Sequence, residues 1–537
     1  MKISAIDLAI IILYLLIIMS VGVYISFRRK NKDSNEGFFL AGRSLNWMLV
    51  GASLFAANIS TIHMVGLAAQ GYKDGLVWGN FEWMAAFLLI ILGLIFAPFY
   101  FRSKISTLPE FLEKRYSPAA RSFLAFMAIL SALFLHIGIS LYAGAVVFEN
   151  FFGIDMWTSI LVISSVTVLY TVLGGLKAVV VTETIQTGVL IIGATVMAIL
   201  AFSSLSDFGI TSYDELRDAL KPHQLSMVQH HADSPLKWYH VILGYPVLGL
   251  YYWCADQTIV QKVLGAKSLQ DAQSGPIFAG FLKILPVFIM VFPGIFAYII
   301  FKDQITDPND ALPIIITELL PVGLKGLVSA ALLAALMSTI AAALNSSGTL
   351  ISIDIIKRIW PTTSDKRLTL IGRITMVVVI ISAIAWSPLI ARFPSIFEAI
   401  NSLLAVLSPP IATVFILGVF WKRGNKEAGL WTLIFGLVMG ILTFILDFSP
   451  ISGKMIITND WGIPFMMQAW WLFVICTLFY IIVSLLTPRP DIENIEGLTL
   501  DRPLSFLIDH KITTWYDARI LALILVMVMV VLYIVFW

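Results

Sequence analysis

FAANISTIHMVGLAAQ, the stretch from Phe55 to Gln70, begins and ends as an apolar helix but is polar in its middle. The interruption consists of Asn58, Ser60, Thr61 and His63. An anchoring helix has no use for four hydrogen-bonding side chains at bilayer depth, because hydrocarbon offers them no partners. The stretch therefore predicts a span that is broken inside the membrane, with carbonyls and polar side chains available to a binding site.

The rest of the chain has the composition of a polytopic membrane protein. Of its 537 residues, 59% are hydrophobic and only 13% are charged, and the mean hydropathy is +0.91, which excludes an ordinary soluble protein. Apolar runs long enough to cross about 30 Å of hydrocarbon recur from end to end. We expect about fourteen spans, at residues 6–27, 45–70, 76–101, 119–150, 155–173, 177–203, 238–260, 273–301, 322–350, 368–391, 395–420, 427–447, 464–487 and 516–537. The first lacks a small-residue cleavage site and is predicted to be retained.

The distribution of basic residues predicts how these spans are oriented. The loop after the first span contains Arg28, Arg29, Lys30 and Lys32, and every second loop after it is also basic. Lysine and arginine favour the cytoplasmic side of short loops. We therefore expect a multi-pass protein of the cell membrane (plasma or inner) with both termini outside. Because its net charge of +2 is sorted by side, we expect a lipid bilayer and no nucleic acid as its partner.

A second interrupted span is predicted at VILGYPVLGLYYWCADQ, residues 241–257. Gly244, Pro246 and Gly249 precede an aromatic cluster there, and proline and glycine both weaken a helix. Five spans separate the two interruptions, so they have opposite orientations. Two discontinuous helices in inverted halves are typical of the central site of a transporter, although a pair of ordinary kinks would leave the same pattern.

Two charged residues are predicted to lie within spans. Glu82 is in the third span and Lys283 is in the eighth, and a charge at the bilayer centre costs at least about 2.5–3.5 kcal/mol. The two side chains either form a structural ion pair or are satisfied by a polar solute between them. Both alternatives require a polar interior.

The ninth span contains a possible cation site. In ALLAALMSTIAAALNSSG, three- and four-residue spacings place Ala335, Ser338 and Thr339 on one helical face. Two hydroxyls, with carbonyls from a broken helix, form a neutral oxygen cage that suits an alkali ion, whereas calcium or magnesium would require more carboxylates. Ordinary packing of hydroxyls between membrane helices is the alternative.

Several ordered motifs resemble the sodium/solute symporter family, and its sodium/sugar cotransporter branch more closely. They are FLAGRSLNW, GASLFAANIS, FEWMAA, TLPEFLEKRY, YTVLGGLKAVV, YYWCADQTIVQKVLGAKS, GFLKILPVFIMVFPGI, STIAAALNSSGTLISIDI and SPPIATVFILGVFWKR. The resemblance covers essentially the whole chain. It implies a transporter and not an enzyme.

The resemblance implies an all-α protein with a LeuT-type fold of two inverted five-helix repeats. The expected division is a leading helix at 6–27, a first repeat at 45–203, a second repeat at 238–420 and trailing helices at 427–537. The implied function is symport of sodium with a glucose- or galactose-like hexose into the cell by alternating access.

The family's functional residues are expected at matching positions of this chain. The sodium site would consist of Ala56, Ile59, Ala335, Ser338 and Thr339. The solute would contact His63, Glu82, Tyr252, Trp253, Lys283 and Asn401. The gates would consist of Asn58 and Tyr252 on the inner side and Leu67, Phe81 and Phe397 on the outer side.

Departures from the family pattern leave other substrates open. Gly249 and Leu404 replace polar residues of the sugar branch, and Glu183 replaces its usual aspartate near the sodium region. Ala341 and Ala342 lack the hydroxyls of a second sodium site, so we expect one sodium per solute. The alternatives are symport of inositol or another polyol, symport of an amino or organic acid, and a sugar sensor or channel that does not pump. An intramembrane enzyme is disfavoured because the spans contain no catalytic or metal-ligand pattern.

Overall fold

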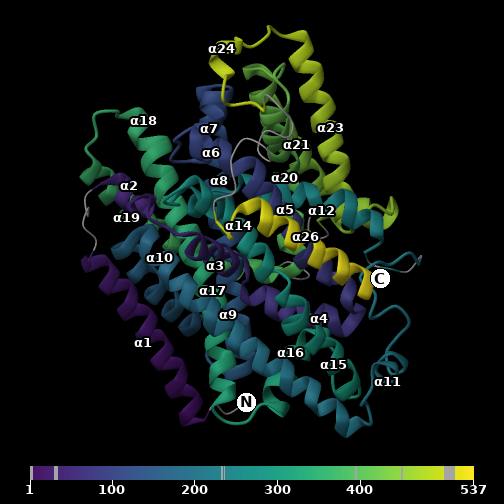
Figure 1. The fold of residues 1–537 in the computed structure, drawn as a ribbon. Helices are drawn as coiled ribbons and strands as arrows, with labels where there is room; N and C mark the ends of the chain where they lie inside the picture. Colours follow the sequence, from purple (N-terminus) through teal and green to yellow (C-terminus); the bar gives the residue numbers. More distant parts are fainter. Residues whose placement is uncertain are drawn as a thin grey trace.

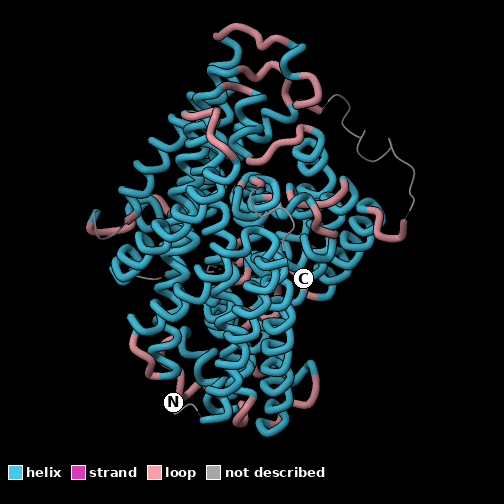
Figure 2. The backbone as a smooth tube through the Cα atoms, turned by 90° about the vertical axis from the view of Figure 1, so that its left-hand side faces the viewer, coloured by secondary structure: helices cyan, strands magenta, loops and turns pink. Residues whose placement is uncertain are grey.

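Helices dominate the computed structural model of the chain (Figure 1). The structure describes residues 4–28, 34–231, 234, 236–392, 396–448, 452–500 and 514–537. Within these ranges the β pairing is limited to two isolated bridges, Leu45 with Ala266 and Gln229 with Lys237. Figure 2 accordingly shows a tube of helices joined by loops. The predicted all-α class is confirmed.

The described helices that matter for the site have the following bounds. They are α1 Ala5–Arg28, α3 Trp47–Asn58, α4 Thr61–Asp74, α5 Asn80–Ile91, α6 Ala97–Arg102, α8 Pro118–Leu130, α9 Ile139–Phe152, α10 Met156–Ser203, α12 Tyr245–Gly249, α13 Gln257–Leu264, α14 Leu269–Leu282, α15 Phe292–Ile300, α17 Leu324–Thr349, α19 Asp365–Trp386, α20 Ile396–Phe420, α21 Lys426–Asp447, α23 Phe465–Leu486 and α26 Ala518–Val535. Wider π-helical turns lie at Ser131–Gly138, His240–Gly244 and Leu250–Ala255.

The predicted number of fourteen spans is not confirmed. Within the described ranges, 11 helices are long and apolar enough to cross a membrane, or up to 12 if α3 and α4 form one bent span. The difference arises at two places. The predicted fifth and sixth spans are joined in α10, and the predicted seventh span is divided into short helices.

A glycine changes the backbone direction within α10. Gly175 has φ 62° and ψ −161° in an otherwise helical run of 48 residues. A Cβ atom added there would lie 2.5 Å from the Phe38 carbonyl oxygen. Only glycine accepts this combination of positive φ and close backbone approach at little cost.

The first interruption lies where the sequence predicts it. Helix α3 begins after Asn46, whose side-chain oxygen accepts a hydrogen bond from the Leu49 N–H at 2.9 Å, as an N-cap does. After α3 ends, Ile59 and Ser60 have extended backbone angles. The helices on either side are bent by 62°, so the span is broken near its middle.

The second interruption is misplaced in the sequence-based prediction. Gly244, Pro246 and Gly249 lie within helical turns, where Pro246 occupies the first turn of α12 and needs no helical donor. The non-helical residue is Asp256, with φ −86° and ψ 124°. Its side chain accepts a hydrogen bond from the Thr258 N–H at 2.7 Å. An aspartate cap, rather than glycine and proline, therefore starts the second half of this span.

Helix α17 forms the core around which the broken helices lie. The most apolar part of its span is 94% buried, against 22% for α1. It contacts α1, α3, α10 and α19, and Figure 1 shows it in the middle of the molecule. This arrangement places the hydroxyls of Ser338 and Thr339 beside the end of α3.

Candidate functional site

The two hydroxyls of α17 meet backbone carbonyls of α3. Ser338 Oγ lies 2.7 Å from the Ala56 carbonyl oxygen and 2.9 Å from that of Ala335. Thr339 Oγ1 lies 3.1 Å from the Ala57 carbonyl oxygen and 3.3 Å from that of Ala335. Five oxygens therefore gather, all of them neutral, and such a set suits a monovalent cation better than a divalent one.

Two details of this cage bear on the predicted sodium set, which stays a prediction. Ala57 contributes a carbonyl that the sequence analysis does not include. Ile59 is fully buried and donates its N–H to the Phe55 carbonyl at 3.0 Å, but no hydrogen bond between it and Ser338 or Thr339 is found in the described part of the chain. The resemblance identifies the broken helix, whereas the rotation of α3 decides which of its carbonyls faces α17.

A cavity of about 150 Å³ lies next to the cage. It would hold roughly ten water molecules, so a monosaccharide-sized solute matches its scale. Thr339 lines the cavity and also belongs to the cage. The predicted residues that line it are Asn58, His63, Leu67, Phe81, Glu82, Tyr252, Trp253 and Lys283. The side chains of Phe397 and Asn401 lie outside the described part of the structure, so their predicted roles stay untested.

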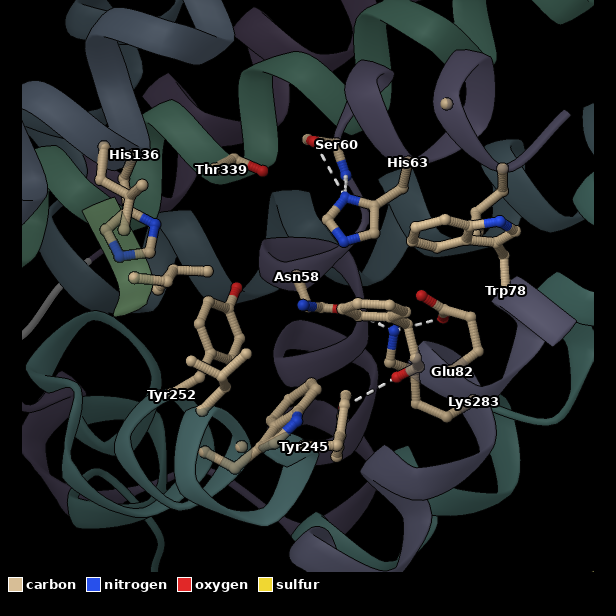
Figure 3. Close-up of a pocket in the computed structure, with 18 of the residues that line it drawn as sticks. Asn58, Ser60, His63, Trp78, Glu82, His136, Tyr245, Tyr252, Lys283 and Thr339 are labelled. Carbon is tan, nitrogen blue, oxygen red and sulfur yellow. Dashed lines mark hydrogen bonds and ion pairs between the residues drawn. The ribbon is translucent and has the colours of Figure 1, made fainter. Parts of the chain in front are cut away.

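Glu82 and Lys283 form a direct ion pair in the wall of this cavity (Figure 3). Lys283 Nζ also donates to the Asn58 side-chain oxygen, at the end of α3. Each of the two charged side chains is only 1% exposed. The carboxylate retains free lone pairs and the ammonium has a third donor, so a solute hydroxyl could join the pair without breaking it.

His63 is held in one orientation by the turn that precedes it. The Ser60 N–H lies 3.3 Å from His63 Nδ1, and the Ser60 hydroxyl lies 3.0 Å from the same nitrogen. A backbone N–H can only donate, so Nδ1 accepts and the proton of the neutral ring is on Nε2. His63 therefore offers a donor to the cavity that it lines.

Aromatic rings cover the apolar parts of the cavity. Phe81 stacks on Trp78 with centroids 5.8 Å apart and meets Tyr245 edge-on at 5.7 Å. Tyr252 meets Trp253 edge-on at 5.1 Å and lies close to Asn58 in Figure 3. Such rings suit the carbon faces of a pyranose. The cavity thus combines apolar covers with a few polar groups.

A buried charge network joins the cage to the second broken span. Lys262 Nζ lies 3.2 Å from Glu183 Oε1 and 3.2 Å from the Ser53 carbonyl oxygen. The Ser53 hydroxyl donates to Glu183. Ser53 lies one turn before Ala56 on α3, so the network connects α3, α10 and α13.

Several cavity-lining residues are not named by the sequence analysis: Gly66, Gln70, Trp78, Leu135, His136, Ser140, Tyr245 and Leu248. His136 Nε2 lies 2.8 Å from Asp256 Oδ2, and both residues are 5% exposed. A histidine at bilayer depth is the signal that could have indicated this pair.

Comparison with known proteins gives a consistent result. A family model described as the sodium:solute symporter family matches residues 38–436. The rabbit sodium/glucose cotransporter 1 is 33% identical over 534 residues, which cover 91% of this chain and 80% of that protein. The human sodium/myo-inositol cotransporter is 34% identical over 541 residues, with coverage of 92% and 75%.

A solved structure shows the fold. The substrate-bound, outward-open state of a Na⁺-coupled sialic acid symporter matches with a TM-score of 0.74 at 22% identity, over 91% of this chain and 99% of that one. The fold is therefore the LeuT type, as predicted.

Proposed function

Because the chain belongs to the sodium:solute symporter family, we propose that it is a sodium-coupled symporter of a glucose- or galactose-like hexose and carries one sodium per solute. Its family consists of transporters, so the protein is not an enzyme. The observation that carries the proposal is the break between α3 and α4. Its end carries the carbonyls of Ala56 and Ala57, which bind the α17 hydroxyls, and the Asn58 side chain, which binds Lys283 in the cavity.

This arrangement supports a coupling mechanism. Sodium bound in the cage fixes the end of α3, and with it Asn58, so that the solute groups are ordered before the solute arrives. Solute binding in turn favours the state in which the cage is complete, since coupling between two sites is reciprocal. The sodium gradient then supplies the work, about 2.3 kcal/mol per charge for each 100 mV.

The proposed roles follow the predicted sets, with the Ala57 carbonyl added to the cage. Ala56, Ile59, Ala335, Ser338 and Thr339 hold sodium, and His63, Glu82, Tyr252, Trp253, Lys283 and Asn401 contact the solute. Asn58, Leu67, Phe81, Tyr252 and Phe397 close the cavity. Residues 45–203 and 238–420 form the two inverted repeats. The likeness to the rabbit cotransporter, which its name describes as a sodium/glucose transporter, supports sugar as the substrate class.

A polyol is the second candidate. The human relative, named as a sodium/myo-inositol cotransporter, is as similar to this chain as the glucose cotransporters. Gly249 offers the cavity no polar contact, and a Cβ there would lie 3.0 Å from Leu88 Cγ and 3.1 Å from Tyr245 Cε1. Because Gly249 lacks the polar side chain that the sugar branch has at this position, the choice between a hexose and an inositol ring depends on the remaining polar contacts.

The test uses the purified full chain in proteoliposomes. Uptake of labelled glucose, galactose and myo-inositol is measured with an inward sodium gradient and with choline in its place. We expect a hexose to accumulate above equilibrium only with sodium. Equilibration without accumulation would indicate a channel, and accumulation of an amino or organic acid instead would contradict the sugar assignment.

The variant Glu82→Ala separates the two ligands. Glu82 lines the solute cavity but does not belong to the oxygen cage. We therefore expect solute binding to be lost, while sodium still changes the signal of a probe attached near the cage. Simultaneous loss of both responses would indicate damage to the fold and would remove this support for the assigned roles.

The stoichiometry is tested by reversal potentials. Only one neutral oxygen cage is proposed, since Ala341 and Ala342 carry no hydroxyl. We expect the measured potential to fit one sodium per solute. A ratio of two to one would show that a second cation site exists.

A further inference from the structure

A pair of polar side chains lies in the cavity wall away from the proposed solute contacts. His136 is in the π-helical turn Ser131–Gly138, and Ser140 follows in α9. Their spacing of four residues places them on one helical face. Both line the cavity and are buried, with exposures of 5% and 3%. Figure 3 shows His136 on the opposite side of the cavity from Glu82 and Lys283.

Asp256 fixes the chemical character of His136. The Asp256 carboxylate accepts from the Thr258 N–H at 2.7 Å with one oxygen and faces His136 Nε2 at 2.8 Å with the other. An ionised carboxylate can only accept, so Nε2 carries a proton. In the neutral ring, Nδ1 is then an acceptor.

These two residues have free hydrogen-bonding capacity. Within the described part of the chain, neither His136 Nδ1 nor Ser140 Oγ has a hydrogen-bond partner. A buried polar group without a partner costs free energy, so both atoms favour a polar group supplied from the cavity.

Several other polar groups of the cavity already bind one another. Lys283 binds Glu82 and Asn58, and His63 Nδ1 is bound by Ser60. The Thr339 hydroxyl lies within hydrogen-bond distance of the Ala57 carbonyl. A solute must share these atoms with their protein partners, whereas His136 Nδ1 and Ser140 Oγ, like Gln70 Oε1 elsewhere in the lining, which has no partner among the described residues, are available without competition.

We propose that His136 and Ser140 form a second polar subsite, which binds a hydroxyl of the solute while Asp256 holds the imidazole. The inference rests on the proposed function. One solute hydroxyl donates to His136 Nδ1, and the Ser140 hydroxyl donates to or accepts from the same edge of the sugar. Glu82, Lys283 and His63 bind the opposite edge. This subsite supplies polar contacts in a cavity where Gly249 and Leu404 supply none.

The subsite has a consequence for specificity. The solute requires hydroxyls on two opposite edges, so a ring that lacks the hydroxyl facing His136 leaves a buried acceptor unpaired. We expect that analogue to bind about tenfold more weakly than the parent sugar, the usual scale for one lost buried hydrogen bond.

The test compares deoxy sugars in matched variants. Each mono-deoxy analogue of the transported hexose competes with the labelled parent sugar for binding to wild type, His136→Ala and Ser140→Ala. In His136→Ala, the parent sugar should bind more weakly. Removal of one particular sugar hydroxyl should then cause no further loss of affinity, because the His136 atom that binds this hydroxyl is absent. Leu135 is an apolar neighbour in the same wall. In Leu135→Ala, all the sugars should bind more weakly by the same factor, and each deoxy analogue should keep its loss of affinity relative to the parent sugar.

A second variant controls for misfolding of His136→Ala. His136→Ala leaves the Asp256 carboxylate unpaired, so we add the double variant His136→Phe with Asp256→Asn. Asparagine is neutral and still caps a helix well. The same deoxy penalty should disappear in it.

The outcomes distinguish this inference from the proposed function. If wild type binds no hexose, the proposed function fails and the subsite fails with it. If wild type binds hexose but every deoxy penalty persists in the His136 variants, or all penalties shrink equally, the subsite is wrong and the proposed function stands.

Discussion

Two lysines that lie deep in the membrane part of this protein are each paired with a carboxylate. Lys283 meets Glu82 and Asn58, and Lys262 meets Glu183 and the Ser53 carbonyl. Each of these two lysines therefore binds both a carboxylate and a second oxygen from α3. The ion pairs reduce the desolvation cost and at the same time attach α3 to its neighbours.

The Glu82 and Lys283 pair gives a prediction about stability. Glu82→Gln or Lys283→Met alone leaves one charge buried without compensation, which costs about 3–5 kcal/mol. The double variant removes both charges, so its unfolding midpoint should lie above that of Lys283→Met alone. Thermal unfolding of the purified protein in detergent measures this.

An exposed pair provides the control. Lys454 and Asp460 form an ion pair whose side chains are 59% and 42% exposed, and breaking such a pair costs at most about 1 kcal/mol. Lys454→Met should therefore leave the midpoint nearly unchanged. A double variant at Glu82 and Lys283 as unstable as the sum of its singles would show that the two charges act independently.

The residues that the sequence does not reveal are those whose role depends on rotation about a helix axis. The resemblance indicates Ala56, but only the packing of α3 on α17 shows that Ala57 faces Thr339. His136 and Ser140 stand in a long apolar run, and their importance depends on Asp256, which is 116 or more residues away in the sequence. Motifs identify such residues only when the partner is known.

Helices α3 and α4 illustrate what can be predicted about elements. Four polar residues within six positions of an apolar run, Asn58 to His63, predict the first break correctly. The second break is predicted in the right span but at the wrong residues, because the glycines and proline are accommodated in helical turns, and because an aspartate followed two residues later by threonine is a weak N-cap signal. Glycine and proline indicate where a helix can deviate, whereas the cap decides where it does.

Gly175 allows a prediction at this scale. Gly175→Ala should lower the unfolding midpoint, because its combination of positive φ and extended ψ costs an L residue about 1–3 kcal/mol and its Cβ would lie 2.5 Å from the Phe38 carbonyl oxygen. Fluorescence-detected size exclusion after heating, with and without the substitution, measures the shift.

Gly188 on the same helix is the matched control. A Cβ there would have no neighbour within 4 Å, so Gly188→Ala should be neutral or stabilising by about 0.5–1 kcal/mol. Equal midpoints for the two alanine variants would mean that Gly175 does not need its special backbone.

For the whole molecule, composition and hydropathy suffice to predict the class, because a chain this apolar buries its backbone only as membrane helices. The LeuT-type fold follows from ordered motifs rather than from hydropathy. The number of spans is less accessible, since a bent span and two spans joined at Gly175 differ only in backbone direction.

The orientation of the termini is a prediction for the whole molecule. Ser4→Cys and Trp537→Cys should react with a membrane-impermeant thiol reagent on intact cells, because the basic loops favour the cytoplasm. Lys426→Cys, in a loop predicted to be cytoplasmic, should react only after permeabilisation. The native Cys254 and Cys476 are buried and should contribute little background. Labelling of Ser4→Cys only after permeabilisation would invert the proposed topology.

In the proposed coupling mechanism, the end of α3 joins the cation cage to the solute cavity. The most direct measurement is sodium-driven accumulation of labelled hexose in proteoliposomes containing wild type, the double variant Ser338→Ala with Thr339→Ala, or Ser347→Ala. Among the residues that the structure describes, the Ser347 hydroxyl binds only the Ala343 carbonyl of its own helix, at 2.8 Å. We predict accumulation above equilibrium for wild type and Ser347→Ala, and equilibration at most for the double variant. Undiminished accumulation by the double variant would contradict coupling through the end of α3.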